Sequence, residues 1–151
     1  MASPRGPRLE QIHPSGRILT VDSEGRTRAA RQLPAFRRVD TIVGSSADPA
    51  VKAQVHAHAH GKRTLVILDS DHFEDHVRAE LDAYWPLVSP GSYLIVQDGA
   101  VNGHPVDPEY GPGPFEAVAA FRETNDGFEV DLGRERMLLT LNPAGFLRRR
   151  G

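Results

Sequence analysis

The stretch Thr64–His104, TLVILDSDHFEDHVRAELDAYWPLVSPGSYLIVQDGAVNGH, decides the fold of this chain. An apolar run ends in Asp69, an amphipathic segment follows, and a second apolar run ends in Asp98. This order predicts a strand, a helix and a second strand parallel to the first. Because the carboxyl ends of parallel strands meet at one edge of an open sheet, we expect the two acids to lie side by side there, where such sheets bind ligands.

The segment between the two acids has the pattern of a helix that is buried along one side. Its apolar residues recur every four positions: Phe73, Val77, Leu81 and Trp85. Asp71 and Glu74 have the spacing of a capping box, which predicts that the helix begins at Asp71. The continuous apolar run at residues 64–69 is typical of a strand that is covered on both faces.

Along the whole chain, predicted strands alternate with short predicted helices. The predicted strands are residues 17–22, 38–43, 64–69 and 92–97, with a closing antiparallel pair at 128–131 and 137–142. The predicted helices are residues 25–33, 48–59, 71–85 and 114–123. We therefore predict an α/β fold: a mostly parallel sheet with helices on both faces and an antiparallel C-terminal strand pair. Residues 1–16 are expected to be loose, and residues 17–151 to form one domain.

Composition narrows the class of protein. The 151 residues carry a net charge of -2, which gives no reason to expect a nucleic-acid partner, and Arg148, Arg149 and Arg150 are interpreted as a solvated tail. There is no cysteine, and no apolar run approaches the roughly 20 residues of a membrane span. The N-terminus lacks the apolar core of a signal peptide. These features favour a soluble cytoplasmic protein without a membrane partner.

Oxygen donors follow both strands of the central stretch. Neither Asp69 nor Asp98 is needed as a helix cap, and carboxylates that converge at a strand edge suit Mg²⁺. Gln97 could add an amide oxygen to such a metal site. His72 lies close to Asp69 in the chain and could act as a base or as a partner of a ligand, with a plain surface histidine as the alternative.

Two further segments have both a functional and an ordinary interpretation. Asp22 ends the first strand, where an acid can accept hydrogen bonds from a ribose, although an acid after a strand is usually a turn residue. The small residues 44–47 let a flat ligand approach the backbone, or they form an ordinary helix-start turn with Asp48 as the cap. The alternating His56, His58 and His60 are interpreted as a solvated helix end, because residues i and i+2 point to different faces of a helix.

Short motifs along most of the chain carry a family resemblance. They are ILTVDSEGR at 18–26, IVGSSADP at 42–49, LDSDH at 68–72, PGSYLIVQD at 90–98, NGHPV at 102–106, GPGPFEAV at 111–118 and LLTLNPAGFLRR at 138–149. Together they resemble the cephalosporin hydroxylase family, which is related to rhamnosyl O-methyltransferases. The resemblance implies a Rossmann-like methyltransferase fold and methyl transfer from S-adenosylmethionine to a hydroxyl of a sugar or another small natural product, assisted by Mg²⁺.

The resemblance also implies roles for individual residues. Asp69 corresponds to a metal-binding acid, and Gln97 and Asp98 to a pair of metal ligands of which the first is commonly glutamate. Gln97 departs from that pattern, and a neutral ligand is expected to weaken Mg²⁺ binding. His72 matches a family residue, and we assign catalytic roles to Asp69 and His72. The cofactor-binding residues would be Asp22 at the ribose and, at the adenine end, Ser45, Ser46 and Asp48.

One family feature has no counterpart in this sequence. Methyltransferases of this kind open with a strand and a Gly-rich loop around the methionine part of the cofactor, so we expect the fold without its first strand. A misassigned start, a fragment, or a strand supplied by another chain would each account for this. Exposed strand edges favour association, so a homo-oligomer is expected. Two hypotheses follow: a methyltransferase with a small-molecule acceptor, or a non-catalytic binding or assembly subunit that retains the fold.

Overall fold

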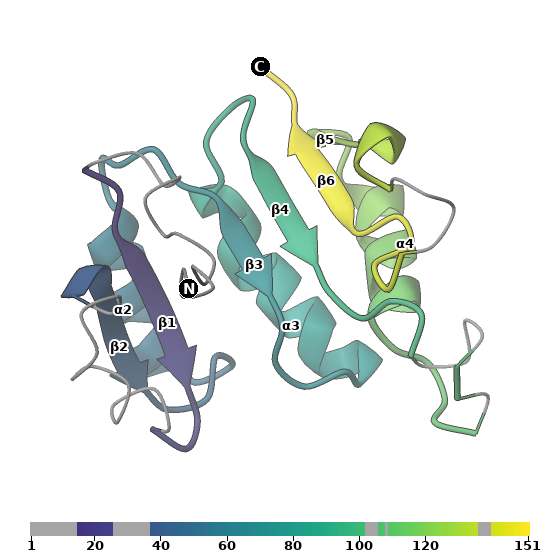
Figure 1. The fold of residues 1–151 in the computed structure, drawn as a ribbon, viewed down its shortest axis with the longest axis horizontal. Helices are drawn as coiled ribbons and strands as arrows, with labels where there is room; N and C mark the ends of the chain where they lie inside the picture. Colours follow the sequence, from purple (N-terminus) through teal and green to yellow (C-terminus); the bar gives the residue numbers. More distant parts are fainter. Residues whose placement is uncertain (1–14, 26–36, 102–105, 108, 136–139) are drawn as a thin grey trace, which may run out of the picture. The chain divides into compact units, whose positions relative to one another are not determined.

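The computed structural model describes residues 15–25, 37–101, 106–107, 109–135 and 140–151 (Figure 1). The architecture is mixed α/β, as predicted, and it divides into two compact units, residues 1–51 and 52–151. The predicted helix at 25–33 and most of the N-terminal segment 1–16 lie outside the described residues. No helix in the described part of the chain is both long enough and apolar enough to cross a membrane.

The first unit contains a parallel pair of strands. β1 (Ile18–Asp22) pairs with β2 (Val39–Val43), in register from Ile18 opposite Val39 to Asp22 opposite Val43. Both strands were predicted at nearly these bounds. The pairing continues past the strand ends, because the Gly44 N–H donates to the Asp22 carbonyl at 3.2 Å.

The helix α2 (Pro49–Ala59) begins in the first unit, where the sequence predicted it. Oδ1 of Asp48 accepts from the N–H groups of Ala50 at 2.7 Å and Val51 at 3.2 Å, which is the arrangement of an N-cap. A Cβ atom on Gly44 would lie 2.8 Å from the Val51 side chain. The absence of a side chain at Gly44 therefore lets the helix start pack closely against the end of β2.

The second unit is built on a four-stranded sheet in the order β3-β4-β6-β5 (Figure 1). β3 (Val66–Leu68) and β4 (Tyr93–Val96) are parallel, as the central stretch predicted. β6 (Phe146–Arg149) is antiparallel to both β4 and β5 (Phe128–Val130). The described strands thus form two separate hydrogen-bonded sheets with equal shares of parallel and antiparallel pairs, and the mostly parallel sheet that we predicted is not observed.

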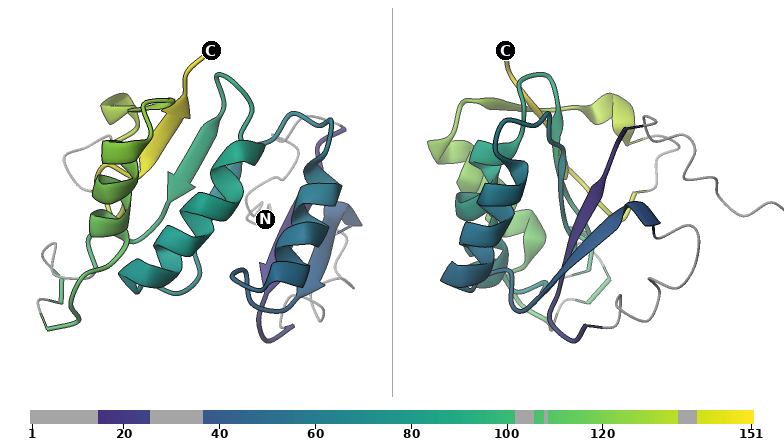
Figure 2. Two further views of the ribbon diagram at one scale, coloured as in Figure 1. Left: turned by 180° about the vertical axis from the view of Figure 1, so that it is seen from behind. Right: turned by 90° about the vertical axis from the view of Figure 1, so that its left-hand side faces the viewer.

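Two helices cover one face of this sheet. They are α3 (Glu74–Tyr84), which continues into the short 3₁₀ helix η3 (Trp85–Leu87), and α4 (Pro114–Thr124) (Figure 2). The core lies between these helices and the strands and consists of Leu68, Val77, Leu81, Tyr84, Val88, Leu94, Val96, Ala117, Val118, Phe121, Phe128 and Leu147. In β3, Leu68 is buried whereas Ile67 is 53% exposed. Among the described residues of this unit, helices cover one face, so the prediction of helices on both faces is not confirmed.

The C-terminal strand lies later in the chain than predicted. The predicted strand at 137–142 falls partly on residues outside the described ranges, and residues 140–142 are not in a strand. β6 instead contains Leu147, which is fully buried between β4 and β5. Arg149 donates to the carbonyls of Pro86, at 3.1 Å, and Val88, and its guanidinium lies 5.4 Å from the centre of the Trp85 ring. The interpretation of the terminal arginines as a solvated tail is thus wrong, because two of them belong to a central strand.

The start of α3 also differs from the prediction. The helix begins at Glu74, its N-cap is Phe73, and no side chain caps it. Asp71 forms a local turn instead, in which Oδ1 accepts from the Phe73 N–H at 3.2 Å. The Glu74 N–H donates to the Pro112 carbonyl at 3.3 Å, so the loop before α4 supplies the acceptor that the expected capping box would have provided.

Candidate functional site

The two acids of the central stretch lie next to each other at the carboxyl edge of β3 and β4. The strands are parallel with Leu68 opposite Val96, so Asp69 and Asp98 follow their ends on the same side of the sheet. The Gln97 N–H donates to the Leu68 carbonyl at 3.0 Å and extends the pairing up to the two acids. The expectation drawn from the order of the apolar runs is confirmed.

A third residue, His72, joins the two acids. Asp69, His72 and Asp98 each offer one donor atom within 4.8 Å of the others. Nε2 of His72 lies 3.3 Å from Oδ2 of Asp98, and both side chains are half-buried, whereas Asp69 is exposed. Octahedral Mg²⁺ holds neighbouring donors about 3 Å apart and opposite donors about 4 Å apart. The separations here, of up to 4.8 Å, are somewhat wider, and the two carboxylates make the group a candidate site for a divalent metal ion.

Gln97 contacts the same group through hydrogen bonds. With its amide nitrogen facing the acid, the orientation that gives both amide atoms suitable partners, Gln97 donates to Asp69 Oδ2 at 2.7 Å and Oδ1 at 3.3 Å. The sequence suggested Asp69, Gln97 and Asp98 as metal ligands. The structure brings all three together, and it adds His72 to them as a further possible ligand.

The backbone of Asp98 has an uncommon conformation that a neighbouring turn supports. Its φ is +56°, in the left-handed region, which few residues other than glycine adopt. The Asp98 N–H donates to Oδ1 of Asn142 at 2.9 Å, and the turn that contains Asn142 is closed by a bond from the Gly145 N–H to the Asn142 carbonyl at 3.0 Å. Sequence reasoning missed Asn142, because a contact across 44 positions leaves no local signal.

A buried glutamate supports the other acid. Glu80 on α3 is only 3% exposed, and its Oε1 accepts from the Ser70 hydroxyl at 2.8 Å. Because Ser70 follows Asp69 directly, this bond ties the segment after β3 to the helix. Sequence reasoning also missed Glu80, although its position between Val77 and Leu81 places it near the buried stripe of the helix.

Glu80 also affects a neighbouring tyrosine. Burial, together with the negative charge of Glu80, raises the pKa of Tyr84 to about 12. His76, one turn before Glu80, places its Nε2 3.7 Å from Glu80 Oε1. The buried side of α3 therefore carries a group of titratable side chains directly behind the segment that holds Asp69.

The residues predicted to bind a cofactor lie in the first unit, around the ends of β1 and β2. Oδ1 of Asp22 accepts from the N–H groups of Glu24 and Gly25, both at 3.0 Å, as in a turn. Oγ of Ser45 accepts from the Ala47 N–H at 3.2 Å, and Asp48 caps α2. Ser46 lies between them in the same loop. These bonds explain the local conformation, and the ligand-binding role of the four residues stays a prediction.

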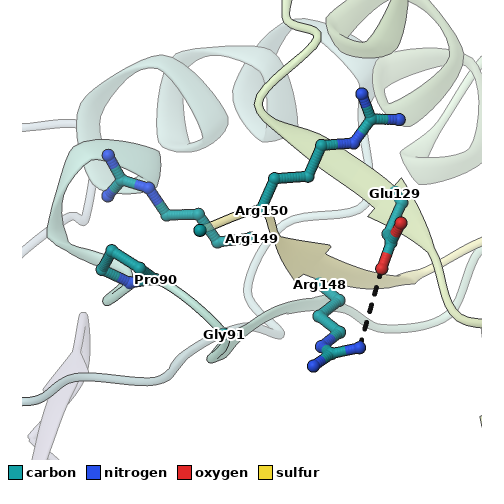
Figure 3. A pocket seen from close by; sticks show the side chains of 7 residues that line it. Pro90, Gly91, Glu129, Arg148, Arg149 and Arg150 are labelled. Atoms are coloured by element: carbon teal, nitrogen blue, oxygen red, sulfur yellow. Dashed lines mark ion pairs between the residues drawn. The ribbon is translucent and has the colours of Figure 1, made fainter.

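A histidine on α2 and a cavity near the C-terminus were also considered as sites, and neither includes Asp69 or Asp98. His56, the first histidine of the alternating run, has a ring nitrogen 2.7 Å from the Ala83 carbonyl. A cavity of about 440 Å³ is lined by Pro90, Gly91, Glu129, Arg148, Arg149, Arg150 and Gly151 (Figure 3). It lies at the opposite end of β4, and Arg148 is paired with Glu129 across 3.7 Å. We therefore locate the candidate site at the β3–β4 edge.

Comparison with known proteins identifies the family. Residues 7–150 match the family described as Rhamnosyl O-methyltransferase/CmcI. The chain belongs to this family. A family relative, the rhamnosyl O-methyltransferase of Mycobacterium tuberculosis, is 39% identical over 145 residues, which cover 92% of this chain and 58% of the relative. The chain thus spans a little over half the length of that protein.

Two more relatives show how far the likeness extends. The rhamnosyl O-methyltransferase of Mycobacterium leprae is 39% identical over 123 residues, covering 78% of this chain and 54% of that protein. The demethylmacrocin O-methyltransferase of Streptomyces fradiae is 32% identical over 83 residues, covering 55% of this chain and 20% of that protein. The resemblance read from the sequence motifs is confirmed at the level of the family.

Proposed function

We propose that this chain is an S-adenosylmethionine-dependent O-methyltransferase, or the part of one that activates the acceptor. The acceptor would be a hydroxyl group of a sugar or of another small natural product. The observation that carries the proposal is the group of Asp69, His72 and Asp98 at the carboxyl edge of two parallel strands. Family relatives named as O-methyltransferases support the reaction type.

The chemistry of the group suits the activation of a hydroxyl. S-adenosylmethionine, when bound, supplies the methyl group. The His72 imidazole would take the proton of the acceptor hydroxyl, and Asp98, 3.3 Å from its Nε2, would stabilise the resulting positive charge. Asp69 and Asp98 would hold a divalent metal that orients the acceptor oxygen and lowers the pKa of its hydroxyl. In the first unit, Asp22 would bind the ribose of the cofactor.

The adenine end of the cofactor would rest on the loop before α2. Ser45 and Ser46 have short side chains, so a flat ring can approach the backbone there. Asp48 already accepts two hydrogen bonds from the first turn of α2 through Oδ1. We therefore expect Asp48 to act on the ligand chiefly by fixing this loop.

Calorimetric titration with S-adenosylmethionine and S-adenosylhomocysteine, each with and without Mg²⁺, tests the proposal. We expect binding of both, with a part that depends on Mg²⁺ and disappears in Asp69→Ala. Asp71→Ala is a matched control, because Asp71 lies two residues away and, within the described ranges, its carboxylate accepts a local turn bond. If neither compound produces heat under either condition, the proposed cofactor is wrong for this chain.

An exposed strand edge favours a second candidate, a binding or assembly subunit. β3 pairs only with β4 among the described strands. Ile67 on this strand is 53% exposed, and Leu65, just before it, is 48% exposed. Apolar side chains on an edge strand favour association with another chain. Concentration-dependent self-association without any binding of S-adenosylhomocysteine would support this second function over the first.

A further inference from the structure

The amide of Gln97 uses the same carboxylate oxygens that a metal ion would need. In the orientation that gives both amide atoms suitable partners, its nitrogen donates to Oδ2 of Asp69 at 2.7 Å and to Oδ1 at 3.3 Å. We propose that Gln97 stabilises the metal-free form of the centre through these bonds and thereby makes its affinity for divalent metal low. This inference rests on the metal centre of the proposed function.

Each acid of the centre has a nitrogen-bearing side chain beside it. Asp69 faces the Gln97 amide, and Asp98 faces His72 across 3.3 Å. Two carboxylates that approach closely repel each other unless a cation or hydrogen-bond donors compensate their charge. Here the amide donates to Asp69, and a ring nitrogen of His72, which can carry a positive charge, lies 3.3 Å from Asp98. The centre can therefore keep its arrangement without a metal ion.

The same contacts oppose metal binding. A cation that binds Asp69 must compete with the amide for the carboxylate oxygens, because the amide nitrogen lies close to both of them. Gln97 also adds no negative charge, and the number of charged ligands strongly affects the affinity of a site for divalent cations. A Gln97 that instead bound the metal through its amide oxygen would increase the affinity, so the two roles predict opposite effects of its removal.

Three variants separate these roles in calorimetric titrations with Mg²⁺ and Mn²⁺. Gln97→Glu replaces the donor with a charged ligand and should bind both metals about tenfold more tightly or better. Gln97→Ala removes the competing donor without adding charge and should also bind more tightly than wild type. Gln54→Glu makes the same change of charge on the exposed side of α2 and should bind like wild type.

Thermal unfolding in EDTA provides a second measurement. Gln97→Glu places a carboxylate against Asp69, so its midpoint should fall below that of wild type and rise again when Mg²⁺ is added. Gln54→Glu should show neither effect. Weaker metal binding by Gln97→Ala than by wild type, or a Gln97→Glu protein as stable as wild type in EDTA, would overturn the inference.

A failure of the proposed role of Gln97 can be told apart from a failure of the proposed function, because separate experiments test the two. Binding of S-adenosylhomocysteine to wild type without metal tests the cofactor, and the metal titrations need no cofactor. If cofactor binding fails while Gln97→Ala and Gln97→Glu both gain metal affinity, the role of Gln97 stands and the proposed reaction does not.

Discussion

Glu80 shows how one buried side chain can support a functional edge. Its carboxylate accepts from Ser70 at 2.8 Å, and Ser70 directly follows Asp69. Burial raises the pKa of Tyr84, which is 4% exposed, and the charge of Glu80 raises it further. Glu80 therefore links the segment after β3 to the buried side of α3, through the Ser70 hydroxyl in the first and Tyr84 in the second.

The raised pKa of Tyr84 predicts a loss of stability in alkaline solution. The unfolded tyrosine releases its proton near its ordinary pKa of 10.0, whereas the folded one holds the proton until about pH 12. Between these values the unfolded state binds fewer protons, so the free energy of unfolding falls as the pH rises. Tyr84→Phe should show a shallower fall in urea unfolding between pH 9 and pH 11. Parallel curves for the two proteins would contradict this prediction.

The candidate site was partly predictable at this scale. Asp69 and Asp98 could be placed together because each follows an apolar run, and strand ends align in a parallel pair. His72 was named as a candidate from its nearness to Asp69 in the chain. Glu80 was not named as a candidate, because its role depends on how deeply α3 packs against the sheet. The sequence pattern does not reveal that depth.

At the scale of elements, the turn of residues 142–145 is the structure that sequence reasoning misread. The apolar residues before it suggested a strand, but β6 begins only after the turn, at Phe146. A Cβ atom on Gly145 would overlap the Val96 carbonyl, and the Val96 N–H donates to the Gly145 carbonyl at 2.9 Å. This close approach of two backbone segments is a long-range feature, which local patterns do not reveal.

The same turn should stabilise the edge of β4 through Asn142. Asn142→Ala leaves the half-buried Asp98 N–H without its acceptor, at an expected cost of about 1–3 kcal/mol in the free energy of unfolding. Asn142→Asp keeps an acceptor oxygen in the same place and should lose less. Urea unfolding at neutral pH measures both variants. Equal losses for the two, or no loss for Asn142→Ala, would show that the bond does not support Asp98.

At the scale of the whole molecule, the sheet of the second unit has one face covered by helices and an edge strand with exposed apolar residues. The apolar run at 64–69 suggested a strand covered on both faces, yet Leu65 and Ile67 are about half exposed. Periodicity indicates which residues are apolar, but it does not show whether another part of the chain, or another chain, covers them. The alternation of strands and helices was therefore predictable, and the covering of each face was not.

The exposed side of β3 predicts self-association. Ile67→Lys introduces a charge at the edge strand and should shift the protein toward monomer, because charged side chains discourage pairing between strand edges. Light scattering after size-exclusion chromatography over a range of concentrations measures the shift. Leu132→Lys, at a position 68% exposed on another segment, is the control and should leave the association unchanged. A monomeric wild type at all concentrations would contradict the expected oligomer.

We propose that the carboxyl edge of β3 and β4 is the metal-binding and reactive centre of this chain. Mn²⁺ added in small amounts to ¹⁵N-labelled protein tests it directly, because the paramagnetic ion broadens nearby amide signals even when it binds weakly. We predict that the signals of Asp69, His72 and Asp98 broaden first, and that Asp69→Ala removes the effect. Broadening centred on other acids, or no selective broadening at this edge, would contradict the account.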